Sequence, residues 1–177
     1  MASTCVVVGT IVLLEKNDMA ALGRKRGLGG AGAAILWGGL IAGIIDITVA
    51  TITTISHGGQ PLRMLQGIAF ALIGPSAFKG GWGTAAIGLI CHFAITFGAA
   101  TAYYLVSRFW SVMTREPLVC GLLYGVPVFW FTNFVIVPMS KIGRILPGTQ
   151  GQMMFGLVVL LVGVGLPIAF MAKRYAG

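Results

Sequence analysis

The residue in this sequence whose chemistry is hardest to explain is Asp46, the one acidic residue of the apolar run 38–52. Every other residue of that run is apolar or small. A charge at the centre of a bilayer costs about 2.5–3.5 kcal/mol on insertion scales, and such a residue almost always faces the protein interior. Asp46 therefore needs a polar partner, and the rest of the sequence has to supply it.

Helical spacing places Asp46 on a face that packs against protein. Gly39, Gly43, Asp46 and Ala50 are separated by four, three and four residues, so they share one side of a helix. Gly39 and Gly43 form a GxxxG pair, which lets another backbone approach closely. We therefore expect Asp46 to face a neighbouring helix and not lipid.

The best candidate partner is His92, in the predicted membrane-spanning helix 82–106. With a rise of about 1.5 Å per residue, Asp46 and His92 fall ~4 Å and ~3 Å from the middle of two antiparallel helices, both toward the same membrane surface. Gly88 and Thr96 share the face of His92. The sequence predicts a hydrogen bond or ion pair between Asp46 and His92.

Further polar residues lie at similar depth. Asn133 is ~7 Å from the middle of its helix, again toward the same surface. Thr132, the residue before Asn133, supplies a further hydroxyl group. The predicted intramembrane polar cluster consists of Asp46, His92, Asn133, Thr48 and Thr96. The predicted helix-packing residues are Gly39, Gly43, Gly88, Gly121 and Gly125.

Other chemistries lack their motifs. The sequence has no HExxH metalloprotease motif, no GxSxG nucleophile motif, and no CxxC spacing among its three cysteines. His57 falls at a helix end, away from His92, so the two are poorly placed to hold one haem. We expect no catalytic residues, no cofactor and no bound metal.

Composition places the chain in the membrane class. Hydrophobic residues make up 57% of the 177 residues and charged residues only 9%, against about 25% charged residues in a soluble domain. The net charge of +8 fits loops beside anionic lipid headgroups. Without a basic patch interleaved with aromatic residues, nucleic-acid binding is not expected.

Hydropathy predicts an all-α protein with a four-helix transmembrane bundle. A spanning helix needs about 20 mostly apolar residues, and four segments qualify, at approximately 32–55, 82–106, 118–139 and 152–171. Between the first two, the segment 62–73 is too short to span, so we expect a short interfacial or re-entrant helix. The predicted division is an N-terminal cytoplasmic segment, 1–31, and a transmembrane domain, 32–177.

The start of the chain does not have the pattern of a cleaved signal. No charged side chain precedes its short apolar run, and acidic residues follow it. Eight of the twelve basic residues fall in the N-terminal segment, the second loop and the C-terminal tail, and four fall on the opposite side. This asymmetry predicts that both termini are cytoplasmic.

Several stretches in combination resemble a known group of proteins. The stretches "GLIAGIIDIT", "LQGIAFALIGPSAFKGG", "GLICHFAITFGAATAYYLVSR" and "GLLYGVPVFWFTNFVIVPMS" resemble segments of a family of small bacterial inner-membrane proteins with four predicted helices and no assigned function. The resemblance covers about residues 35–140. It implies the bacterial inner membrane and no particular reaction.

Two functions of different classes follow from these observations. The favoured one is a structural or accessory component, not an enzyme, whose helices pack on one another or on a neighbour in a homo-oligomer or larger membrane complex. The alternative is a small transporter or proton-linked permeation unit that uses the Asp/His cluster. Because four helices leave a cramped pathway, the alternative requires an assembly of chains.

The predicted orientation has a direct test. Alkaline phosphatase folds only outside the cytoplasm, so a fusion after Gly59 is expected to be active in bacteria, and a fusion after Gly177 is expected to be inactive. The opposite pair of activities would show that the basic residues do not set the orientation in this way.

Overall fold

The computed structural model describes the backbone of residues 2–141 and 149–176 and the side chains of 29–141 and 149–175. These residues form helices and turns, with no strand among them. Four helical segments are long and apolar enough to cross a membrane: Gly29–Ser56, Gly81–Phe109, Pro117–Met139 and Gln150–Tyr175. The predicted fold class, an all-α membrane protein with four spanning helices, is confirmed.

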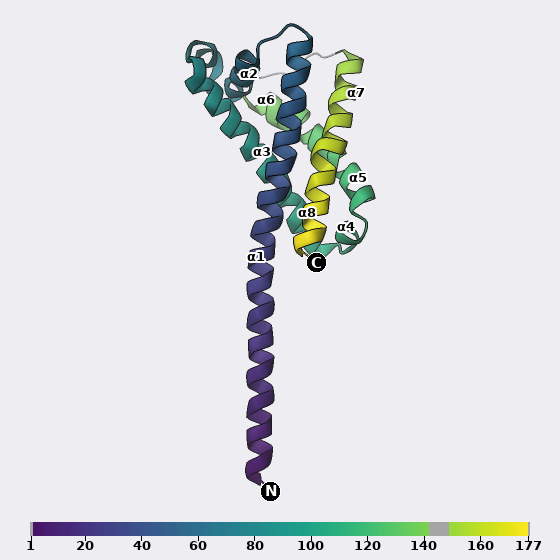
Figure 1. The fold of residues 1–177 in the computed structure, drawn as a ribbon. Coiled ribbons are helices and arrows are strands. Elements are labelled where there is room, and N and C mark those ends of the chain that lie inside the picture. The colour runs from purple at the N-terminus through teal and green to yellow at the C-terminus, as the bar shows by residue number, and fades with distance from the viewer. Residues whose placement is uncertain (1, 142–148, 177) are drawn as a thin grey trace.

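The chain runs through eight α-helices and three shorter helical segments of other types, within the described residues (Figure 1). Their bounds are α1 (Ala2–Ser56), α2 (Pro61–Ile73), η1 (Gly74–Lys79), α3 (Gly81–Phe109), α4 (Val112–Arg115), α5 (Pro117–Phe131), η2 (Thr132–Ile136), α6 (Val137–Met139), α7 (Gln150–Val159), η3 (Leu160–Gly165) and α8 (Leu166–Ala176). Here η1 is a 3-10 helix, whereas η2 and η3 are π-helices.

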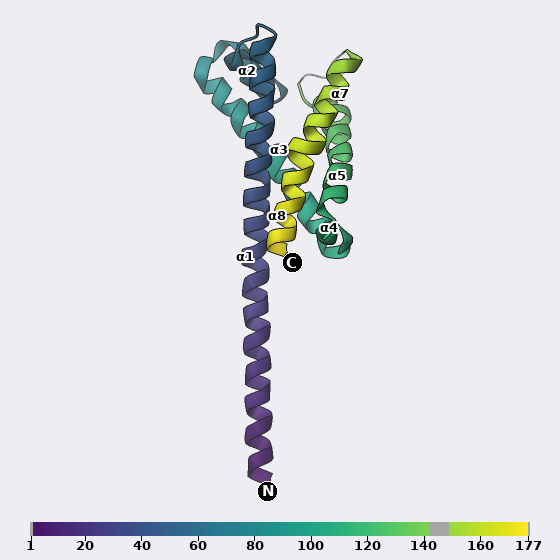
Figure 2. The same ribbon diagram turned by 45° about the vertical axis from the view of Figure 1, so that its right-hand side comes forward.

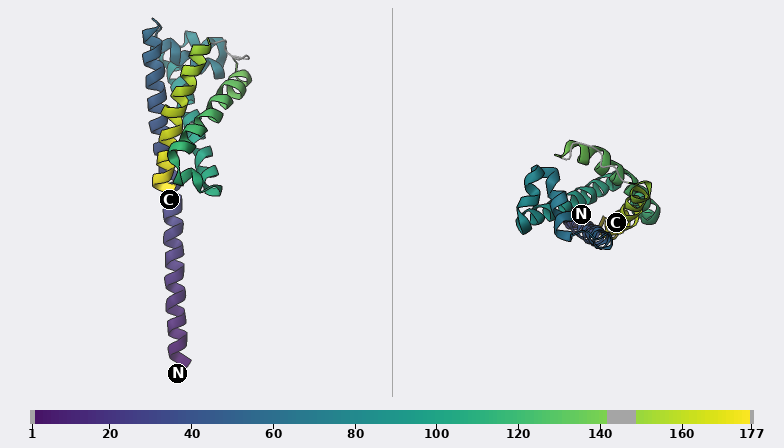
Figure 3. Two further views of the ribbon diagram at one scale, coloured as in Figure 1. Left: turned by 90° about the vertical axis from the view of Figure 1, so that its right-hand side faces the viewer. Right: turned by 90° about the horizontal axis from the view of Figure 1, so that it is seen from above.

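The first spanning helix continues far outside the bundle. Helix α1 is unbroken over 55 residues, so the N-terminal segment 1–31 is helical from Ala2 onward. Its first half extends past the other helices, at the end of the bundle where the C-terminus lies (Figure 3). Residues 29–56 of the same helix form the first apolar span.

The short helix predicted between the first two spans is present as α2. Pro61 fits its first turn, where a missing N–H breaks no helical hydrogen bond. The helix ends before Gly74, whose φ of 74° lies in the left-handed region that favours glycine. Gln66 Nε2 donates to the Gly81 carbonyl at 3.0 Å, which ties α2 to the start of α3. Helix α2 and the start of α3 lie at the end of the bundle opposite the C-terminus (Figure 1).

Glycines allow the close contact between α1 and α3. A Cβ at Gly39 would lie 2.9 Å from Phe97 Cε1, and a Cβ at Gly43 would lie 2.6 Å from Phe93 Cε1. Both distances are below ordinary van der Waals contact. The two phenylalanine rings of α3 therefore occupy the space that side chains on this face of α1 would need.

The remaining predicted packing glycines also lie at close contacts inside the chain. A Cβ at Gly88 would lie 3.2 Å from the backbone N of Ala69, in α2. A Cβ at Gly121 would lie 2.9 Å from the carbonyl oxygen of Gly165, and one at Gly125 would lie 2.8 Å from the backbone N of Leu161. Helix α5 therefore packs almost directly on the backbone of η3.

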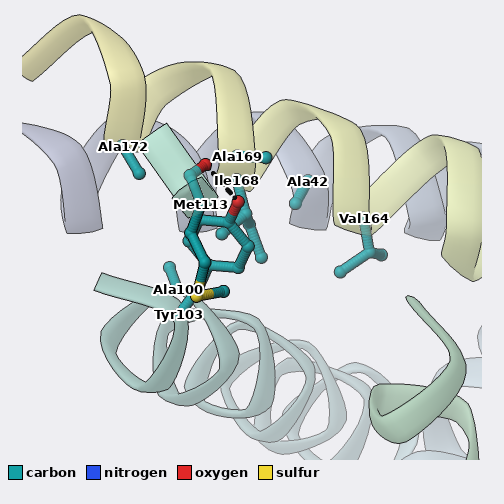
Figure 4. Packing of buried hydrophobic residues seen from close by; sticks show 8 residues of the cluster. All are labelled: Ala42, Ala100, Tyr103, Met113, Val164, Ile168, Ala169 and Ala172. Atoms are coloured by element: carbon teal, nitrogen blue, oxygen red, sulfur yellow. Dashed lines mark hydrogen bonds between the residues drawn. The ribbon is translucent and has the colours of Figure 1, made fainter. Parts of the chain in front are cut away.

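The buried apolar core gathers at the C-terminal end of the bundle (Figure 4). Small side chains of α1, α3 and α8 surround the ring of Tyr103, which is fully buried. Its hydroxyl donates to the Met113 carbonyl at 2.9 Å, and the Tyr124 hydroxyl donates to the Ala99 carbonyl at 2.8 Å. The core residues are Ala42, Ala100, Tyr103, Met113, Val164, Ile168, Ala169 and Ala172.

Prolines explain the two π-helical segments. Pro138 lies two residues beyond η2, and Pro167 lies two residues beyond η3. Proline has no N–H, and its ring clashes with the carbonyl four residues earlier, which here falls inside each π segment. The wider π turn accommodates that carbonyl. Above these segments α7 diverges from α1 (Figure 2).

The contact between α5 and η3 predicts the outcome of adding one methyl group. Gly125→Ala is expected to lower the melting temperature in detergent, because overpacking of a tight contact costs about 1–3 kcal/mol. The matched control is Gly98→Ala, where a Cβ would meet nothing within 4 Å, and its melting temperature should not fall. Equal melting temperatures for the two variants would contradict the close contact.

Candidate functional site

The structure brings Asp46 and His92 together. Asp46 Oδ2 lies 3.9 Å from His92 Nδ1, at the crossing of α1 and α3. The His92 side chain is 9% exposed and the Asp46 side chain 25% exposed. This juxtaposition agrees with the estimate from helix depth, which placed the two side chains at the same level of two antiparallel helices.

The hydrogen bond made by Nε2, the ring nitrogen that does not face Asp46, shows where neutral His92 carries its proton. His92 Nε2 lies 2.9 Å from the carbonyl oxygen of Gly43. Because a carbonyl oxygen only accepts hydrogen bonds, Nε2 must carry a proton and donate it. In the neutral imidazole, Nδ1 is then an acceptor, and it faces the carboxylate of Asp46.

Two acceptors therefore face each other at a distance too long for a direct hydrogen bond. Within the part of the chain that the structure describes, no hydrogen bond reaches either carboxylate oxygen of Asp46. The Asp46 side chain is only partly buried, and removing a carboxylate from water is unfavourable unless a hydrogen-bond donor replaces the water. A water molecule or an N–H group of a ligand that lies between the two groups can donate a hydrogen bond to each of them.

Asp46 and His92 line a cavity of about 390 Å³, which we call the deep cavity. Helices α1, α2 and α3 form one side, and the segments η2, α6 and η3 form the other. Most of its lining is aliphatic, as at Ile68, Ile95 and Val128. The polar side chains in it are Asp46, His92, Thr96 and Thr132.

Asp46 also lines a second cavity, of about 530 Å³, which we call the middle cavity. On α1 its lining consists of Asp46, Val49, Ala50 and Thr53, the spacing of one helical face. Asp46, Thr132 and Leu160 line both cavities. Thr132 begins η2 and Leu160 begins η3, so the two π-helical segments lie at the boundary between the deep and middle cavities.

A third space, the mouth cavity, adjoins the middle cavity at the end of the bundle. It measures about 740 Å³ and includes the exposed residues Ser56, His57 and Thr149. Thr53, Gln152 and Phe155 line both the mouth and the middle cavities. The mouth cavity lies where α1 ends and α7 begins, opposite the C-terminus (Figure 1). An adjoining series of cavities therefore runs from that end to Asp46.

The other predicted cluster residues lie at different distances from the Asp46–His92 pair. Thr96 lines the deep cavity and donates to the Phe93 carbonyl at 3.0 Å. Asn133 lines the middle cavity, and its Nδ2 donates to the Phe129 carbonyl at 2.9 Å. Thr48 is exposed, donates to the Ile44 carbonyl and lines none of these cavities. The structure does not bring Thr48 into the cluster.

Thr53 and Gln152, which line both the mouth and the middle cavities, were not among the residues predicted from the sequence. Thr53 follows Asp46 by seven residues, so the helical spacing already contained that signal. Gln152 is brought near by the packing of α7 against the rest of the bundle, which no spacing within one helix reveals. Pro138 and Pro167 were the available signals for the π-helical segments, a feature frequent at functional sites.

A comparison with protein-family models, curated proteins and solved structures finds no match to this chain. The resemblance to a family of small bacterial inner-membrane proteins therefore stays a prediction. Among the described residues, no group of three or more His, Cys, Asp or Glu side chains is arranged to hold a metal ion. The site is thus defined by its own geometry: a carboxylate and an imidazole between two cavities.

The cavities predict which of two adjacent valines meets water. Val159 lines the middle cavity, whereas Val158 is 53% exposed on the outer surface and lines none of these cavities. In a background without the three native cysteines, Val159→Cys should react with a water-soluble, membrane-impermeant thiol reagent. Val158→Cys, at nearly the same depth, should not react, because the reactive thiolate does not form in lipid. Equal rates for the two would contradict a water-filled middle cavity.

Proposed function

We propose that the protein is a small proton-linked transport unit in which Asp46 and His92 bind and release a proton. The observation that carries the proposal is that Asp46, a membrane-embedded carboxylate with no hydrogen bond among the described residues, lines both the deep and the middle cavity. An ionisable group inside a membrane protein typically marks an ion or proton pathway. A purely structural carboxylate would instead be bonded within dry protein.

The proposed step is the transfer of one proton between the pair and water. When Nδ1 of His92 takes the proton, an imidazolium faces a carboxylate; when Asp46 takes it, a neutral acid faces a neutral imidazole. Release to water in the middle cavity leaves one negative charge on the pair. Asp46 from α1 and His92 from α3 are the two titratable side chains that line the deep and middle cavities, within the described residues.

The favoured expectation from sequence, a structural or accessory component, receives less support from the packing. The main argument for a structural component was that the GxxxG faces could pack against a neighbouring subunit. In the structure these glycines lie against Phe93 and Phe97 of the same chain, or against η3. Contacts inside the chain account for them, so they give no argument for a partner.

We further propose a bacterial inner membrane with both termini on the cytoplasmic side, from the resemblance and from the distribution of basic residues. In that orientation the mouth cavity opens to the outside of the cell. A single chain of four spans leaves little room for a complete pathway to the cytoplasmic side. The proposal therefore includes a homo-oligomer, in which a second copy completes the path.

The proposal is tested by proton movement in proteoliposomes that contain a pH-sensitive dye and experience an imposed potassium-diffusion potential. We expect the wild type to change the internal pH faster than protein-free liposomes. Asp46→Asn should reduce the rate to the protein-free level, because an amide cannot take up the proton.

The matched control is Glu116→Gln, which neutralises an exposed carboxylate in the turn before α5 and should retain the wild-type rate. His92→Ala should also slow proton movement, since Nδ1 is lost. The proposal is removed if the wild type does not exceed protein-free liposomes. The proposal is also contradicted if the double variant Asp46→Asn, His92→Ala moves protons at the wild-type rate.

A further inference from the structure

The deep cavity offers hydrogen-bond acceptors and carries no cationic residue in its lining. The Asp46 carboxylate accepts hydrogen bonds. His92 Nδ1 also accepts, because in the neutral ring the proton is on Nε2, which donates a hydrogen bond to the Gly43 carbonyl. Thr96 already donates its hydroxyl proton to the Phe93 carbonyl, so its oxygen offers lone pairs. Such a lining favours a ligand that donates hydrogen bonds and carries positive charge, and it disfavours an anion.

The rest of the lining is apolar and large enough for a small organic molecule. The volume of about 390 Å³ lies within the range of roughly 300–1,000 Å³ typical of small-molecule pockets. A further, almost wholly apolar cavity of about 480 Å³ adjoins it. Ile95, Ala99, Val128, Thr132 and Ile136 line both spaces, so an apolar group held near Asp46 can extend into this side cavity.

Two other occupants fit less well. A hard metal cation such as Ca²⁺ takes about six to eight oxygen ligands, whereas the oxygen-bearing side chains here are Asp46, Thr96 and Thr132. A lipid acyl chain would match the aliphatic walls but would leave the carboxylate and Nδ1 without a donor. A cation with N–H groups and an apolar body satisfies both parts of the cavity.

We propose that the deep cavity binds a small lipophilic amine, with its ammonium group between Asp46 Oδ2 and His92 Nδ1. These acceptors are 3.9 Å apart, so one ammonium group can donate a hydrogen bond to each. The apolar part of the amine lies against Ile68, Ile95 and Val128. This inference rests on the proposed function and gives it a substrate class: the ammonium group and the proton compete for the same two acceptors, which links amine movement to proton movement in the opposite direction.

The experiment measures thermal stabilisation of the purified full chain in detergent by three probes of similar shape. The probes are 2-phenylethylamine, its neutral counterpart 2-phenylethanol, and the anion 3-phenylpropanoate. A ligand that binds the folded state raises the melting temperature with concentration. We expect stabilisation of the wild type by the amine and none by the alcohol or the anion.

Two variants identify the site. Asp46→Asn should abolish stabilisation by the amine, whereas Glu116→Gln should retain it. Gly67 lines the deep cavity, and a Cβ there would meet nothing within 4 Å, so Gly67→Leu should fill the cavity and weaken amine binding. Its matched control is Gly83→Leu, at a glycine with equal space that does not line the cavity.

Each outcome decides the inference. It is overturned if the amine does not stabilise the wild type, if it stabilises Asp46→Asn equally, or if the alcohol stabilises as well as the amine, which would indicate an apolar cavity that accepts an acyl chain. Proton movement in proteoliposomes without amine separates the two proposals. If it persists while the amine fails to bind, only the amine site is wrong. If the amine binds but protons move neither under the potassium potential nor in response to an imposed amine gradient, the proton-linked function is wrong.

Discussion

The hydrogen bond from His92 Nε2 to the Gly43 carbonyl, 2.9 Å long, determines the chemistry of the whole site. It joins α1 to α3 in a region where water does not compete for the carbonyl. It also assigns the imidazole proton to Nε2, which leaves Nδ1 as an acceptor toward Asp46. This contact depends on Gly43, because a side chain there would meet the Phe93 ring. Gly43 thus allows both the close packing and the contact that sets the tautomer of neutral His92.

The bundle is tight at one end and open at the other, and both properties come from identifiable residues. At the C-terminal end, small side chains such as Ala100, Ala169 and Ala172 belong to the core cluster that includes the buried Tyr103. Farther from that end, the third and fourth spans each contain a π-helical turn, η2 and η3, followed two residues later by Pro138 and Pro167. The cavities lie beside these turns, where the regular helical packing is interrupted. Asp46 lies at the transition between the two kinds of packing.

This arrangement explains how a carboxylate is retained in an apolar bundle. In the tight half, Asp46 would be enclosed by aliphatic and aromatic groups without a hydrogen-bond donor. Where it lies, Asp46 faces His92 in the deep cavity and also lines the middle cavity. The many exposed apolar side chains of the spans, such as Ile90 and Leu123, suit contact with lipid tails. At this depth Asp46, His92, Thr96 and Thr132 line the deep cavity, whereas Thr48 is exposed.

The sequence by itself indicated the membrane class, the four spans, the short helix before the second span and the similar depth of Asp46 and His92. These features depend on hydropathy, chain length and helical rise, which are local properties. The sequence did not give the separation of 3.9 Å between Asp46 and His92, which is too long for the predicted direct hydrogen bond. Only the tertiary structure decided which nitrogen of His92 faces Asp46 and that Gln152 lines the path to the site. Those facts depend on how each helix is rotated about its axis and on how far the π turns separate α7 from α1. Both are set by contacts between residues far apart in the sequence, so no spacing within one helix can reveal them.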